Sequence, residues 1–188
     1  MYDPAEVTVP AMVRGEFDDM PPHYALTQQE KPDYSAWSES GQYMHGFRSH
    51  VHDSNELAED IAIYYGMVSL MDKYIGQILN NLERLGLADD TIIVFTTDHG
   101  HFYGQHGLIA KGPFHYEDMV RLPFLCRWPG RIPQGQRSQA LQSLVDLPPT
   151  LLSLAGVEVP RYMTGVDQSD VWTAEDDAAR DGVVVENH

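Results

Sequence analysis

One short stretch of the chain carries most of the residues that could bind a metal or handle an anion. Asp98 and His99 follow an apolar run, and Lys111 and His115 come after a loop rich in glycine and histidine. Adjacent carboxylate and imidazole groups suit a divalent cation, and the imidazole moves the preference away from an all-oxygen calcium cage. The ammonium group of Lys111 can then meet an anionic group that the metal holds.

The other charged residues of this stretch allow more than one role. His115 can donate a proton to a leaving oxygen or bind an anion. Glu117 and Arg121 are four residues apart, so we expect a helical ion pair rather than a catalytic role. His101 and His106 either contact the metal ligands and orient them, or lie on the solvent side of the loop. The sequence leaves both alternatives open.

Other kinds of catalytic or binding site have little support in the sequence. The chain has neither the Gly-x-Ser-x-Gly elbow of serine hydrolases nor a Walker-type phosphate loop. The single cysteine, Cys126, lies in an apolar run, where a small buried hydrophobe is expected rather than a reactive thiol. His45, His50 and His52 lie in an irregular stretch without supporting ligand spacing, and we expect surface histidines there.

Length and charge limit the classes of partner. At 188 residues the chain is long enough for a packed α/β domain without disulfides or structural metals. The formal net charge of −16 argues against nucleic acid and against an anionic membrane as partners. Any anionic substrate must therefore be held by local positive groups. The sequence does not predict a compartment.

The elements expected on either side of this stretch follow an α/β order. Apolar residues at alternating three- and four-residue steps predict one long packing helix from Asp53 to Gly86. The run Thr91–Thr97 is apolar without alternation, which predicts a strand covered on both faces in a parallel sheet. Ligands collect beyond the carboxyl ends of such strands, where Asp98 and His99 stand.

Further elements are expected before and after the long helix and its following strand. Downstream we expect a strand at Leu122–Trp128, a short strand at Leu141–Val145, a helix capped by Asp146 that ends at Gly156, and a buried strand at Val183–Val185. Residues 1–53 show no sustained period and predict an irregular surface segment at the substrate rim. Residues 54–188 then form the α/β part, which we expect to be cut because a core strand begins just before the sequence stops.

The motifs of the central stretch occur together in one known family. They are Thr97-Asp98-His99-Gly100, Gly104-Gln105-His106-Gly107-Leu108, Lys111-Gly112, Tyr116-Glu117, Arg121-Leu122-Pro123-Phe124 and Arg127-Trp128-Pro129-Gly130. With this combination the chain resembles the sulfatase family, within the alkaline phosphatase-like superfamily. The resemblance extends over about residues 56–186 and corresponds to the C-terminal half of the catalytic domain.

The resemblance implies a fold and a chemistry. The fold would be a partial alkaline phosphatase-like α/β/α sandwich with a mostly parallel sheet. The reaction would be hydrolysis of a small anionic sulfate ester, with phosphodiesters or phosphonate esters as the alternative. Asp98 and His99 match metal ligands, and Lys111 matches the lysine that binds the sulfuryl oxygens. Many sulfatases have Asn in place of His99, so the metal stays open, with calcium first and magnesium, manganese or zinc as alternatives.

The chain also departs from the family pattern. The family's nucleophile lies in a Cys/Ser-x-Pro-x-Arg motif, and neither Cys126 nor any serine supplies that motif here. The paired aspartates of the family's first strand also have no counterpart. We therefore expect a sulfatase fragment that is incomplete at both ends and inactive as an isolated chain, because covalent catalysis needs a nucleophile. A non-catalytic homologue is the alternative, and unpaired sheet edges would favour self-association.

Overall fold

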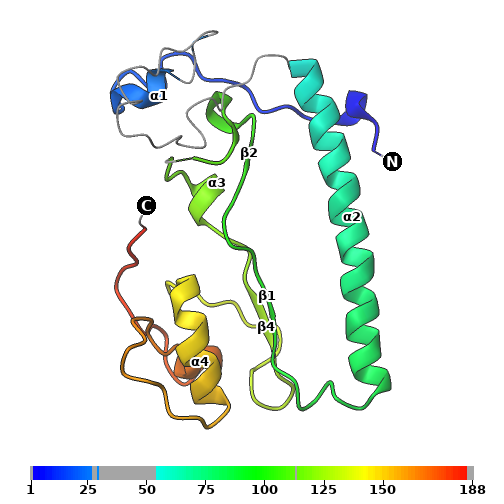
Figure 1. Cartoon of the computed structure of the whole chain (residues 1–188), viewed down its shortest axis with the longest axis vertical. Helices are drawn as coiled ribbons and strands as arrows, with labels where there is room; N and C mark the ends of the chain where they lie inside the picture. Colours follow the sequence, from blue (N-terminus) through cyan, green and yellow to red (C-terminus); the bar gives the residue numbers. More distant parts are fainter. Residues whose placement is uncertain (1, 27–28, 30–53, 113, 186–188) are drawn as a thin grey trace. The chain divides into compact units, whose positions relative to one another are not determined.

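The computed structural model describes residues 2–26, 29, 54–112 and 114–185 (Figure 1). The chain forms two compact units, which are named here unit 1 (Met1–Ile78 and His99–Leu122) and unit 2 (Leu79–Asp98 and Pro123–His188). The elements are, in order, η1 (Pro4–Glu6), α1 (Pro22–Leu26), α2 (Ser54–Arg84), β1 (Ile93–Phe95), β2 (Phe102–Tyr103), η3 (Gln105–Gly107), β3 (Ile109–Ala110), α3 (Glu117–Val120), β4 (Leu125–Arg127), η4 (Leu144–Asp146), α4 (Leu147–Leu154) and α5 (Ser169–Trp172). A domain boundary at residue 53 stays a prediction.

The predicted long helix is present as α2. It ends where the sequence indicated, because Gly86 adopts a left-handed φ of 68° just beyond it. The amide of Gly86 donates to the carbonyl of Glu83 at 3.0 Å, and the amide of Leu87 donates to that of Leu82 at 2.9 Å. These two bonds form a Schellman motif, which satisfies carbonyls that the helix end would otherwise leave without partners. The predicted N-terminal cap, Asp53, lies outside the described residues.

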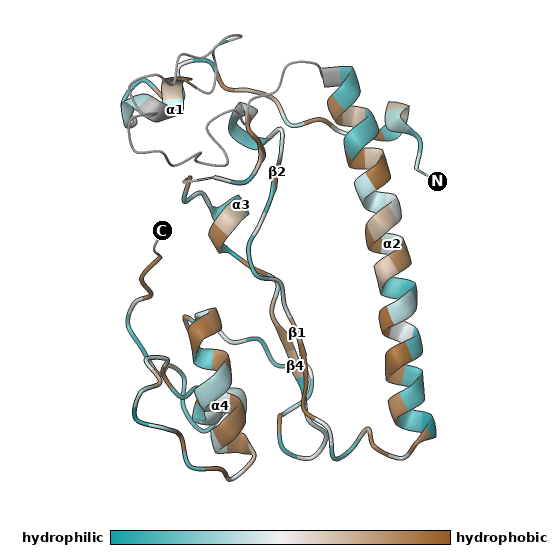
Figure 2. Ribbon diagram, in the orientation of Figure 1, coloured by the Kyte–Doolittle hydropathy of each residue, from teal (hydrophilic) through white to brown (hydrophobic). Residues whose placement is uncertain are grey.

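The expectation that α2 is a packing helix holds for its first turns. Leu57 and Ile61 are each only 4% exposed. Further along the helix, Met71 and Ile78 are exposed although they continue the same apolar period. Figure 2 shows that apolar residues recur along the whole length of α2. Periodicity decides that a helix forms, whereas burial depends on which neighbours reach it. In the described part of the chain, none of the helices has the length and apolar content that crossing a membrane requires.

An aromatic core organises unit 1. Phe102 and Phe114 are fully buried, and Phe17 and Tyr24 of the N-terminal segment pack against them. The rings of Tyr24 and Phe114 meet edge to face with centroids 4.9 Å apart. Residues 2–26 are largely irregular, as expected, but two aromatic residues of this segment belong to the core rather than to the surface. Isolated aromatics without a period give no sign of burial in the sequence.

The described strands form two antiparallel pairs. In unit 2, β1 pairs with β4, so strands lie within both predicted runs, Thr91–Thr97 and Leu122–Trp128. In unit 1, β2 pairs with β3. The parallel neighbours expected for β1 are not among the described residues, and Phe95 of β1 is 43% exposed rather than covered. An apolar run favours a strand, but the direction of the neighbouring strand is decided by tertiary pairing.

Two other strands predicted in unit 2 are wrong. Leu141–Val145 runs into the 3-10 helix η4, and Val183–Val185 is exposed chain without strand pairing. Short apolar runs do not distinguish a strand from other conformations, and here no described strand pairs with either segment. The helix predicted after Asp146 is present as α4, with two prolines in its first turn where no amide partner is needed.

Asp146 is the centre of a buried polar network in unit 2. Its carboxylate is 2% exposed and accepts hydrogen bonds from the amides of Ser143 at 2.9 Å and Val166 at 2.8 Å. The side-chain amide of Gln168 donates to it at 3.3 Å, and Arg180 forms an ion pair with it. Asp146, which the sequence predicted as a helix cap, therefore binds residues of the polar connection after α4 and holds that connection against the start of the helix.

Candidate active site

A short hairpin in unit 1 positions the loop that the sequence singled out. It consists of β2 and β3, with Phe102 opposite Ala110. Gly104 and Gly107 form the turn, with φ values of 100° and 68° that side-chain-bearing residues rarely adopt. A Cβ at these positions would lie 2.7 Å and 2.5 Å from the flexible ends of the Leu57 and Met12 side chains, which can move aside. The positive φ values, rather than lack of space, therefore favour glycine in this turn.

The structure brings His99 and Lys111 together across the hairpin. The Lys111 Nζ lies 3.0 Å from the His99 Nε2, and the His99 Nδ1 lies 2.7 Å from the carbonyl oxygen of Gly100. A carbonyl oxygen only accepts, so Nδ1 carries the proton and Nε2 presents its lone pair, to which the ammonium donates. The ring of His99 is thus fixed in the tautomer that a metal-ligating histidine uses.

The backbone beside His99 lies directly against α3. The amide of Gly100 donates to the carbonyl of Met119 at 2.9 Å. A Cβ at position 100 would overlap the backbone of Asp118. Glycine is therefore required at this point, and its contact with α3 holds the carbonyl that orients the His99 ring.

Asp98 belongs to the other unit. It is the last residue of Leu79–Asp98 in unit 2, whereas His99 begins a segment of unit 1. Asp98 is exposed, and the Thr97 hydroxyl donates to its carboxylate at 3.2 Å. Among the residues that the structure describes, no group of three or more His, Cys, Asp or Glu could hold a metal ion. Metal ligation by Asp98 and His99 therefore stays a prediction.

The other predicted site residues are distributed more widely. His115 is exposed, and no hydrogen bond or ion pair joins it to another described residue. Glu117 and Arg121 form the predicted ion pair in and just after α3, at 3.8 Å and with both side chains largely exposed. That prediction is confirmed, whereas a catalytic role for His115 stays a prediction.

His106 has neither of the two roles that the sequence left open. Its ring stacks on Tyr116 with centroids 3.7 Å apart. Its Nδ1 pairs with the carboxylate of Glu16, and its Nε2 lies 3.3 Å from that of Asp118. His106 therefore joins the N-terminal segment to α3 and is a structural residue of unit 1.

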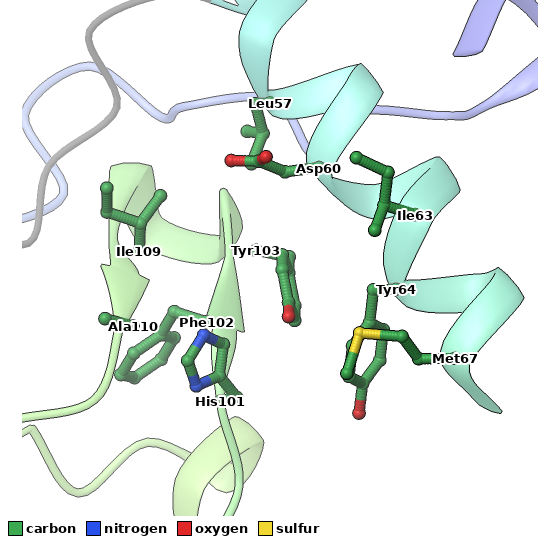
Figure 3. Close-up of a pocket in the computed structure, with 10 residues that line it drawn as sticks. All are labelled: Leu57, Asp60, Ile63, Tyr64, Met67, His101, Phe102, Tyr103, Ile109 and Ala110. Atoms are coloured by element: carbon green, nitrogen blue, oxygen red, sulfur yellow. The ribbon is translucent and has the colours of Figure 1, made fainter. Parts of the chain in front are cut away.

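His101 lies beside the His99–Lys111 pair. Burial lowers the pKa of His101, and the neighbouring His99 and Lys111 lower it further. Its ring lies 4.7 Å from that of Tyr103. With Asp60, Tyr64 and other residues, these two rings line a cavity of about 340 Å³ between α2 and the hairpin (Figure 3). Sequence reasoning missed this cavity, since Tyr64 fits the apolar period of α2 and carries no separate signal.

Comparisons with known proteins find similar sequences and similar folds. Residues 16–157 match the family model described as Sulfatase. An N-acetylglucosamine-6-O-sulfatase from Bacteroides thetaiotaomicron is 43% identical over 112 residues, which are 60% of this chain and 20% of that protein. A solved structure of a protein in complex with its substrate D-glucosamine-2-N,6-O-disulfate matches with a TM-score of 0.60 and 34% identity, over 77% of this chain and 28% of that chain.

A second solved structure has a different activity in its name. It is a phosphonate monoester hydrolase from Silicibacter pomeroyi, which matches with a TM-score of 0.73 and 28% identity over 93% of this chain and 33% of that chain. The chain thus spans between 20% and 33% of the length of these three relatives.

Proposed function

Because the chain belongs to the sulfatase family and has the alkaline phosphatase-like α/β fold, we propose that it forms part of a metal-dependent sulfuric ester hydrolase. The observation that carries this proposal is the 3.0 Å contact between the Lys111 Nζ and the His99 Nε2. It joins an oriented imidazole lone pair to an ammonium group. A metal ion and an anionic ester need these two groups side by side.

Asp98 and His99 are the proposed ligands of one divalent cation. Calcium is the first candidate, and the imidazole keeps magnesium, manganese and zinc as alternatives. A bound cation acts as a Lewis acid and withdraws electron density from the sulfuryl group. The carbonyl of Gly100 supports this role, because its 2.7 Å contact with Nδ1 keeps Nε2 turned outward.

Lys111 is the proposed anion-binding residue. Its ammonium group donates to the sulfuryl oxygens and stabilises the negative charge that develops on the bridging oxygen as the ester bond breaks. A cation held at the His99 Nε2 would take the place of the Lys111 Nζ there, and the ammonium would then be available to the substrate. His115 is the proposed proton donor to the leaving oxygen, and its exposed side chain is accessible to a substrate.

The substrate is proposed to be a small sulfate ester, with sulfated amino sugars the first to test. The names of two relatives, an N-acetylglucosamine-6-O-sulfatase and a structure in complex with a glucosamine disulfate, support this choice. A phosphonate or phosphate ester is the second candidate, which the likeness to the phosphonate monoester hydrolase favours. Parallel turnover of aryl sulfates and aryl phosphonates separates the two.

Lys111→Ala tests the proposal in the protein at its natural length. We expect kcat/KM for 4-nitrophenyl sulfate to fall by about 100-fold or more, as for loss of a charge-stabilising donor. The matched control is Arg121→Ala, which removes another exposed cation and should stay within about twofold. Equal activity of the two variants would contradict the role of Lys111.

The isolated 188-residue chain offers a second test. It has no Cys/Ser-x-Pro-x-Arg motif, so we expect no turnover of sulfate esters by it. Turnover that Lys111→Ala abolishes would overturn that expectation. Such a motif in the coding sequence upstream of Met1 would support the enzyme, and its absence would favour a non-catalytic homologue.

A further inference from the structure

The cavity in unit 1 has no part in the chemistry proposed above. Its volume of about 340 Å³ lies at the lower end of the range for small-molecule sites. Figure 3 shows that the start of α2 forms one side and the hairpin the other. The lining residues that carry the argument are Asp60, Tyr64, His101, Tyr103 and Ala110.

Three rings line the cavity together. The ring of Tyr103 lies 4.6 Å from Tyr64 at an interplanar angle of 36°, and 4.7 Å from His101 at 43°. His101 lies just before β2, two residues from Tyr103, and the two share one face, while Phe102 between them contributes its buried ring to the core. A wall of rings with polar edges suits a ligand that has both C–H faces and hydroxyl groups, as a sugar ring does.

Asp60 gives the cavity its electrostatic character. Burial raises the pKa of Tyr103, and the neighbouring Tyr64 and the charge of Asp60 raise it further. The phenol therefore keeps its proton and can donate, while the carboxylate of Asp60 accepts from hydroxyl groups. The same carboxylate repels anions. The cavity consequently favours an uncharged, hydroxyl-bearing group over a sulfate.

The cavity adjoins the cationic pair along the chain on both strands of the hairpin. Ala110 lines the cavity and is followed in the chain by Lys111, and consecutive Cα atoms are only about 3.8 Å apart. On the other strand, His101 lines the cavity two residues after His99. Ala110 has a φ of 65°, an uncommon value for a residue with a side chain, at the point where the chain turns from the cavity to Lys111. A ligand with a neutral ring and one anionic ester group would span both parts.

We propose that this cavity is the subsite for the sugar ring of a sulfated amino sugar whose ester group binds at Lys111. The inference rests on the proposed function for the ester group only. Binding of the ring needs neither a metal nor a nucleophile, so it is measurable without turnover.

Titration of the protein at its natural length with N-acetylglucosamine, followed by saturation-transfer NMR, tests the subsite. We expect weak, saturable binding that Tyr103→Ala reduces by about tenfold, the effect of one aromatic contact. Asp60→Asn should reduce the affinity by about threefold or more without disturbing the fold, because Asp60 is exposed. Tyr74→Ala is the matched control, since this exposed tyrosine lies on α2 outside the cavity.

Inorganic sulfate is the complementary probe. We expect Lys111→Ala to weaken sulfate binding and leave N-acetylglucosamine binding within about twofold, with Asp60→Asn showing the reverse. The subsite is overturned if N-acetylglucosamine does not bind, or if Asp60→Asn and Tyr103→Ala both bind it as Tyr74→Ala does. Intact sugar binding without turnover of any sulfate ester would contradict the proposed function and leave the subsite standing.

Discussion

The two compact units differ in what they bury. The core of unit 1 is aromatic, with Phe102 and Phe114 fully enclosed. In unit 2 the largest enclosed side chains are polar, and Asp146 and Gln168 belong to one hydrogen-bonded network. Apolar packing is non-directional and loses stability in proportion to the volume removed, whereas a buried network depends on every partner. The unit that carries the candidate subsite is therefore the one built on packing.

Phe102→Ala should have the largest effect on stability. It removes a fully buried ring from the centre of unit 1, and we expect the free energy of unfolding to fall by about 4 kcal/mol. Urea unfolding followed by circular dichroism measures the loss. The control is Tyr162→Ala, which truncates an 80% exposed ring in unit 2 and should change stability by less than about 0.5 kcal/mol. Similar losses for both would contradict the aromatic core.

Asp146→Ala tests the network of unit 2. Arg180 would lose its partner while remaining largely buried, so we expect a loss of about 3 kcal/mol. Trp172 fluorescence during urea unfolding reports on this unit. The double variant Asp146→Ala/Arg180→Met should lose less than Asp146→Ala alone, because no buried charge is left unpaired. The control is Glu158→Ala, at an exposed position. If it lowers the free energy of unfolding as much as Asp146→Ala does, the buried network does not stabilise unit 2 specifically.

Each unit has one alanine with strained backbone angles, so replacing each by glycine compares the effect of backbone strain in the two units. Ala110 in unit 1 and Ala174 in unit 2 have φ values of 65° and 62°. Replacing either by glycine relieves the strain but increases the entropy of the unfolded chain, so we expect a net gain of about 0.5 kcal/mol at each. In the protein at its natural length, only Ala110→Gly should also lower kcat/KM for a sulfate ester, because Ala110 directly precedes the proposed anion-binding Lys111. Equal turnover by the two variants would show that the strain at Ala110 has no role in the site.

The smallest expected effect is a change in the alkylation rate of Cys126, which lies in unit 2. Burial raises the pKa of its thiol, so less thiolate is present at a given pH and alkylation by iodoacetamide should be slower than for an unfolded peptide. Since the folded pKa is the higher one, its stabilising contribution is complete below the unfolded pKa and is lost as pH rises through the folded value. Alkylation at the same rate with and without urea would contradict the burial.

The sequence by itself determined the features that depend on local spacing. The 3.6-residue period fixed α2, and Gly86 fixed its end, because both act through the backbone of neighbouring residues. The pair Glu117–Arg121 followed from a spacing of one helical turn. Asp98, His99 and Lys111 were singled out as candidates because their motifs are local, and these motifs also identified the family.

Only the tertiary structure decided the contacts between distant parts of the chain. The bond between His99 and Lys111 joins residues on opposite sides of a hairpin turn, and Phe17 enters a core formed some 85 residues later. The network of Asp146 and the cavity between Tyr64 and Tyr103 arise in the same way. No local pattern encodes such contacts, because a side chain's partner depends on the path of the whole chain, and a period shows only which face is apolar.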